Sequence, residues 1–105
     1  MSHRILVVDD HPLLRHGLKA LLGSHAEYQV IDEAVDGRDA VAKAIQLQPD
    51  LILMDLSLPG TSGIDATVQI RRRLPQQRVL ALSDDDSEIH IGEAMRAGCI
   101  GCLKK

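Results

Sequence analysis

The sequence predicts an α/β fold built on a doubly wound, five-stranded parallel sheet with helices on both faces. Short runs of consecutive apolar residues alternate along the chain with segments whose apolar residues recur at helical spacing. Apolar runs without polar alternation are typical of strands that are buried on both faces of a parallel sheet. Because the two kinds of segment alternate strictly, right-handed crossovers are expected, and they produce a doubly wound sheet.

Five segments have the composition of strands and four have that of helices. The expected strands are residues 5–8, 28–35, 51–54, 79–82 and 99–104. The first helix begins at Pro12, which suits the first helical position, and stops at Gly23. Its apolar face carries the leucines of this segment: Leu14, Leu18, Leu21 and Leu22. The second follows Gly37 and ends before Pro49.

Capping signatures mark the two remaining helices. The third starts at Ser62, with Asp65 three residues later, and ends near Pro75. The fourth has Asp85 and Glu88 in the same relation and stops at Gly98. We expect it to bury three apolar side chains, those of Ile91, Ala94 and Met95.

Length and composition narrow the class of protein. The 105 residues form one domain, 1–105, and the net charge of −3 argues against direct nucleic-acid binding. We find no signal peptide and no apolar stretch near the ~20 residues of a membrane span. Two cysteines close together do not make a disulfide framework. We therefore expect a cytoplasmic protein that does not contact the membrane.

Polar residues follow the apolar runs where the strands should end. Asp9 and Asp10 follow the first run, Asp55 the third and Ser83 the fourth, and the last strand runs into Lys105. The carboxyl ends of parallel strands share one edge of the sheet, and ligands bind beyond that edge. We therefore expect three carboxylates, a hydroxyl and an ammonium group to converge at one point.

Convergent carboxylates favour a bound cation. Like charges at such short range repel, and a hard divalent ion such as Mg²⁺, or Mn²⁺ in its place, relieves that repulsion. Phosphoryl transfer needs positioning and charge neutralisation, which the ion, Ser83 and Lys105 could supply. Attack by an aspartate oxygen would give an aspartyl phosphate.

These residues together resemble the receiver domain of bacterial response regulators. The likeness rests on Asp9-Asp10, Asp55, Leu58-Pro59-Gly60, Gly63, Ser83 and the terminal lysine. Residues 9–18, DDHPLLRHGL, and the stretch Arg96-Ala97-Gly98 are similar to the NarL/FixJ branch. The resemblance covers the whole chain and implies the flavodoxin-like strand order 2-1-3-4-5. Family members continue past the position of Lys105 into a fifth helix, so we expect a receiver domain truncated before that helix.

The resemblance also implies a function and residue roles. It implies two-component signal transduction: a sensor histidine kinase, or a small phosphodonor, would phosphorylate Asp55 in a Mg²⁺-dependent step. Asp10 would bind the metal directly, Asp9 directly or through water, and the backbone carbonyl of Ser57 would be a further ligand. Ser83 would hydrogen-bond the phosphoryl group and Lys105 would pair with it. The output would be transcription, controlled by a DNA-binding domain outside this chain.

Two departures from the family pattern keep alternatives open. Cys102 stands where an aromatic side chain usually changes rotamer, and Asp84 adds a carboxylate beside the expected site. Both favour an alternative in which the receiver signals without stable phosphorylation. A third possibility is an aspartyl-phosphate hydrolase, although such enzymes typically carry a second acid where this chain has Ser57.

Other residues have simpler interpretations. Cys99 and Cys102 lie three apart in an expected strand and should face opposite sides, so we interpret them as packing residues. His11 is interpreted as a turn residue, with the alternative that it lines the rim of the site. Without a fifth helix, apolar surface would be exposed, and this predicts a homodimer or a swapped dimer.

Overall fold

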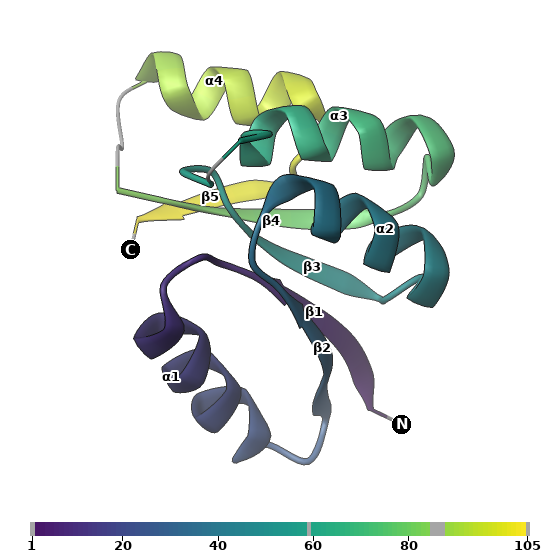
Figure 1. Ribbon diagram of the computed structural model, residues 1–105, viewed down its shortest axis with the longest axis vertical. Coiled ribbons are helices and arrows are strands. Elements are labelled where there is room, and N and C mark those ends of the chain that lie inside the picture. Colours follow the sequence, from purple (N-terminus) through teal and green to yellow (C-terminus); the bar gives the residue numbers. More distant parts are fainter. Residues whose placement is uncertain (1, 59, 85–87, 105) are drawn as a thin grey trace.

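A computed structural model describes residues 2–58, 60–84 and 88–104, which form the expected five-stranded sheet (Figure 1). All neighbouring strands are parallel, in the order β2-β1-β3-β4-β5. The strands are β1 (His3–Val8), β2 (Tyr28–Ala34), β3 (Leu51–Asp55), β4 (Arg78–Ser83) and β5 (Gly101–Lys104). The helices are α1 (Pro12–Gly23), α2 (Gly37–Leu47), α3 (Gly63–Arg73) and α4 (Glu88–Ala97). The predicted fold class and strand order are confirmed.

The helices lie on both faces of the sheet (Figure 1). Successive strand residues point to opposite faces, so β1 serves two separate apolar clusters. Leu6 and Val8 belong to the larger cluster, which lies under α2, α3 and α4. Ile5 and Val7 belong to a smaller cluster, to which α1 contributes Leu18 and Leu22. None of the described helices is long and apolar enough to cross a membrane.

Side-chain caps fix where two helices begin. Ser62 accepts a hydrogen bond from the Asp65 backbone N–H at 3.2 Å, which confirms the predicted start of α3. Asp36 caps α2 in the same way, through the Asp39 N–H at 2.8 Å. The predicted Asp85–Glu88 pair falls partly outside the described residues.

Two sequence-based expectations, the burial of Met95 and the start of the last strand at Cys99, were wrong. Met95 is 46% exposed, and Leu21, which was placed on the apolar face of its helix, is 62% exposed. Helical spacing defines an apolar stripe, but only the part of the stripe that faces the sheet is buried. Cys99 precedes β5 instead of lying in it, because the chain turns at Gly98 with φ of +114°.

Candidate metal centre

The sheet register brings the predicted acidic residues together. Val8 of β1 pairs with Met54 of β3, so the next residues, Asp9 and Asp55, emerge side by side at the carboxyl edge. Both aspartates are completely buried, whereas the side chain of Asp10 is 32% exposed. Three carboxylates therefore meet at the junction of β1 and β3, as the sequence predicts.

Two other predicted site residues, Ser57 and Ser83, lie close to Asp55. Ser83 is the last residue of β4 and is 1% exposed. The backbone N–H of Ser57 donates a hydrogen bond to Asp55 Oδ1 at 3.0 Å, which fixes the start of the following loop. Ser83 pairs with Lys104 in the β4–β5 register, and Lys105 itself lies outside the described residues.

His11 also lies in the acidic cluster, a placement that the sequence alone had left open. Its Nδ1 atom lies 2.9 Å from Asp9 Oδ1, 3.1 Å from Asp10 Oδ1 and 3.9 Å from Asp55 Oδ2. Its backbone N–H also donates to Asp9 Oδ1, at 2.8 Å. The open alternative, that His11 lines the site, is the arrangement the structure shows. The only signal in the sequence is its place directly after the Asp pair.

An ion-pair network holds the loop that carries Asp9, Asp10 and His11. Arg15 Nη1 donates to the Asp9 backbone carbonyl at 2.9 Å, and its Nε pairs with Glu33 of β2 at 3.2 Å. Lys19 Nζ reaches the same carboxylate at 2.9 Å. The hydrogen bond from Lys19 is the main reason that the pKa of Glu33 is lowered. Arg15, a residue of α1, thus connects this loop to α1 and to β2.

Close backbone approach fixes the loop that follows Asp55. A Cβ atom at Gly63 would overlap the Asp55 carbonyl oxygen and lie 2.7 Å from Leu56 Cα. At Gly37, a Cβ would lie 2.8 Å from Thr61 Cβ. Because glycine lacks that atom, α2 and α3 can both press against this loop. The backbone that carries the candidate acceptor is therefore tightly confined.

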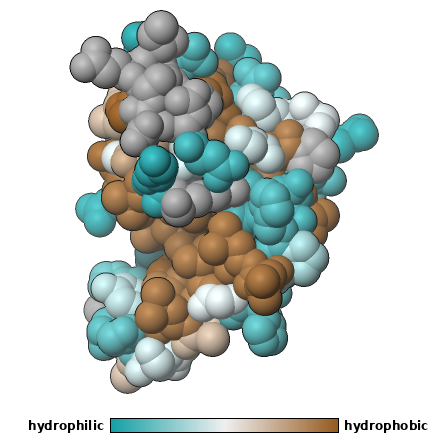
Figure 2. Space-filling model, turned by 90° about the vertical axis from the view of Figure 1, so that its left-hand side faces the viewer, coloured by the Kyte–Doolittle hydropathy of each residue, from teal (hydrophilic) through white to brown (hydrophobic). Residues whose placement is uncertain are grey.

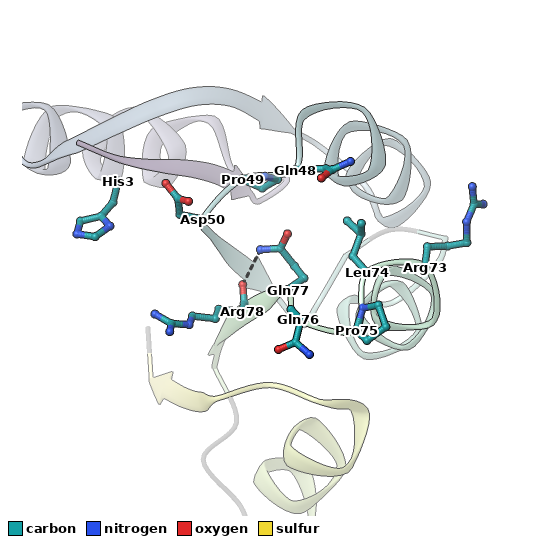
Figure 3. A pocket seen from close by; sticks show the side chains of 10 residues that line it. All are labelled: His3, Gln48, Pro49, Asp50, Arg73, Leu74, Pro75, Gln76, Gln77 and Arg78. Carbon is teal, nitrogen blue, oxygen red and sulfur yellow. Dashed lines mark hydrogen bonds between the residues drawn. The ribbon is translucent and has the colours of Figure 1, made fainter. Parts of the chain in front are cut away.

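Two surface depressions lie at opposite edges of the sheet. One, of about 510 Å³, adjoins the acidic cluster and is lined by His11, Leu13, Leu14, Gly17 and Asp84. Asp84 is exposed there, beside the candidate site as the sequence predicts. The other, of about 600 Å³, is lined by residues at the starts of β3 and β4, including Asp50 and Arg78 (Figure 3). Of these two depressions, only the first shares a residue with the acidic cluster, namely His11.

The donor set of the acidic cluster suits a hard divalent cation. Asp9, Asp10, His11 and Asp55 each offer one ligand atom, and these atoms lie within 4.8 Å of one another. Within the described residues, the buried Asp10 Oδ1 accepts no hydrogen bond of good geometry. A cation would give that oxygen a partner and would offset the repulsion among the carboxylates.

The two cysteines pack against the larger core cluster and are free thiols. Cys99 is buried, with its Sγ 3.9 Å from Thr67 Oγ1, and Cys102 is partly buried. Burial raises the pKa of both thiols. It is the largest of several causes for Cys99 and the sole cause for Cys102. A raised pKa leaves little thiolate at neutral pH, so the packing interpretation is supported.

A doubly wound sheet with an acidic cluster at its carboxyl edge defines the class of receiver-like domains. The chain belongs to the response regulator receiver domain family, whose model matches residues 5–105. It is 40% identical over 98 residues to the response regulator protein VraR of Staphylococcus aureus, covering 93% of this chain and 47% of that protein. The chain therefore spans about half the length of the curated relatives it matches.

Solved structures agree with this family. A LuxR-family two-component response regulator from Aurantimonas sp. SI85-9A1 superposes with a TM-score of 0.96 at 35% identity, over 100% of this chain and 75% of that one. The receiver domain of the response regulator NarL from Mycobacterium tuberculosis gives 0.94 at 32% identity, over 98% and 83%. The chain is thus a receiver domain related to LuxR-family response regulators of two-component systems.

Proposed function

We propose that this receiver domain accepts a phosphoryl group on Asp55 and passes on the change as a conformational signal. The observation that carries the proposal is the burial of Asp55 beside Asp9 at the carboxyl edge of a receiver fold. An Asp55 carboxylate oxygen would attack phosphorus and form the new P–O bond. The P–N bond to the donor imidazole would break, and the departing nitrogen would keep the electron pair.

The residues around Asp55 have separate roles in this proposal. Asp9, Asp10 and Asp55, with the Ser57 backbone carbonyl, would hold Mg²⁺ or Mn²⁺, which neutralises phosphoryl oxygens when bound. The Ser83 hydroxyl, at the end of β4, would donate a hydrogen bond to the phosphoryl group. Lys105, which follows β5, would supply a positive charge.

Mass spectrometry tests this assignment directly. Incubating the chain with acetyl phosphate and Mg²⁺ should add one phosphoryl mass, and Asp55→Asn should abolish the addition. Asp50→Asn is the matched control, because Asp50 lies at the opposite edge and hydrogen-bonds the Arg4 N–H. It should be phosphorylated like the parent chain. Undiminished phosphoryl mass in the Asp55 variant would overturn the assignment.

We infer that the phosphodonor is a sensor histidine kinase in the cytoplasm and that the output is transcription through a DNA-binding domain. The family and its LuxR-type relatives support this inference.

We also propose self-association through exposed apolar side chains. Leu13 and Leu21 of α1 are 86% and 62% exposed, and apolar side chains gather on the face where α1 lies (Figure 2). A sedimentation profile showing only monomer at high concentration would contradict the proposed self-association.

A receiver that signals without stable phosphorylation is the second candidate, and Asp84 favours it. Its exposed carboxylate lines the depression beside the acidic cluster and would repel an incoming phosphodonor. Beryllofluoride, which mimics a phosphoryl group, separates the two candidates. Failure of a folded chain to bind it would favour the second. A hydrolase is not proposed, because position 57 offers a serine and no second carboxyl group.

A further inference from the structure

We propose that His11 is a metal ligand of this centre and that its imidazole makes the site prefer transition-metal ions such as Mn²⁺, Co²⁺ and Ni²⁺ over Mg²⁺. The inference deepens the proposed function, since it rests on the acidic cluster being a metal centre. It starts from the position of His11 Nδ1, which lies between the carboxylates of Asp9 and Asp10 and faces that of Asp55.

The separations match those expected of ligands that share one ion. In an octahedral site with bonds of about 2.1 Å, adjacent donor atoms lie ~3.0 Å apart and opposite ones ~4.2 Å apart. His11 Nδ1 is 2.9 Å from Asp9 Oδ1 and 3.1 Å from Asp10 Oδ1, both adjacent-ligand separations. Its 3.9 Å distance to Asp55 Oδ2 falls between the two values. The imidazole nitrogen thus already stands at one corner of a coordination shell.

Local structure holds the imidazole at this corner. The His11 backbone N–H is fixed on Asp9 Oδ1 at 2.8 Å, and Pro12 begins α1 directly afterwards. Arg15 anchors the Asp9 carbonyl at 2.9 Å and so restrains the same loop from the other side. The His11 side chain is 58% exposed, which leaves room for water ligands on the solvent side. Coordination therefore requires little rearrangement of the loop.

A nitrogen donor changes which ions the centre favours. Mg²⁺ prefers oxygen ligands and retains several waters, so it gains little from an imidazole. Imidazole suits later first-row ions, whose affinities rise from Mn²⁺ through Co²⁺ to Ni²⁺. The competing arrangement is that His11 only donates its Nδ1–H to Asp9 Oδ1 and stays outside the shell when metal binds. The two arrangements differ in whether nitrogen is bonded to the ion.

Pulsed electron paramagnetic resonance of bound Mn²⁺ distinguishes them, because a coordinated ¹⁴N nucleus modulates the electron spin echo. The chain, free of any histidine tag, should show this modulation. His11→Gln should bind Mn²⁺ without it. His16→Gln is the matched control, since His16 is an exposed histidine on α1 outside the cluster, and should retain it. Labelling all histidines with ¹⁵N should remove the ¹⁴N signal without any substitution.

Affinity provides a second readout. We expect His11→Gln to weaken Ni²⁺ binding by about tenfold or more relative to Mg²⁺ binding, as lost imidazole coordination should. If Mn²⁺ binds the parent chain without nitrogen modulation, the His11 ligand is refuted while the acidic metal centre stands. If the modulation persists in His11→Gln, another nitrogen is the ligand and the proposal fails. If Mn²⁺ does not bind the parent chain at all, the metal centre itself is refuted.

Discussion

Replacing Gly63 with alanine would insert a methyl group into the tightest backbone contact of the site. The added Cβ would lie 2.7 Å from Leu56 Cα, where ordinary contact begins at 3.4 Å, so relieving this contact alone requires the start of α3 to move by at least about 0.7 Å. The Asp55 carbonyl oxygen blocks the same position. Overpacking of this kind costs about 1–3 kcal/mol. For a domain of this size, ~2 kcal/mol lowers Tm by roughly 10 °C.

Thermal unfolding followed by circular dichroism measures this effect. The matched control is Gly17→Ala, in the interior of α1, where an added Cβ meets nothing within 4 Å. Because alanine favours helix over glycine, that variant should gain about 0.5–1 kcal/mol. The two alanines should therefore shift Tm in opposite directions. A Gly63→Ala protein as stable as the parent would refute the close approach of α3 to the Asp55 loop.

Substitutions at three further positions test other parts of the structure. Ser62→Ala removes the side-chain cap of α3 and should lower the unfolding free energy in urea by about 1 kcal/mol, whereas Ser62→Asp should retain it. Ile70→Ala empties a fully buried position of the larger cluster and should cost about 2–5 kcal/mol in the same assay. The lowered pKa of Glu33 means that its ion pairs stabilise the fold above the unfolded-state pKa and are lost as pH falls through the folded-state value. Glu33→Gln should therefore flatten the loss of stability in acid titrations; an unchanged acid limb would contradict the role of its ion pairs with Arg15 and Lys19.

The site was predictable where it depends on strand ends. A buried parallel strand needs a continuous apolar run, and the residue after the run must emerge at the carboxyl edge. Asp9 and Asp55 follow such runs. Once the strand order is known, it follows that the two residues lie side by side. Ser83 was placed by the same logic at the end of β4.

Features set by side-chain direction in loops were not predictable. His11 returns to the acidic cluster because its backbone N–H binds Asp9 Oδ1, and no periodic pattern in the sequence encodes that bond. Cys99 was assigned to a strand, but the turn at Gly98 delays β5 to Gly101. The two-residue period of a strand therefore does not apply to Cys99, and both cysteines contact one cluster.

The helices flanking the site differ in how firmly they are held. α3 buries Ala66 and Ile70 completely, whereas no residue of α1 is buried. Elements with few buried contacts open at lower free energy, so α1 should unfold locally before α3. Its amides should exchange with deuterium faster than those of α3 in the unliganded chain, and equal protection would contradict this ranking. His11 immediately precedes α1 and lies against the carboxylates. Binding of a metal ion at the cluster would therefore act on α1, the less firmly packed of these two helices.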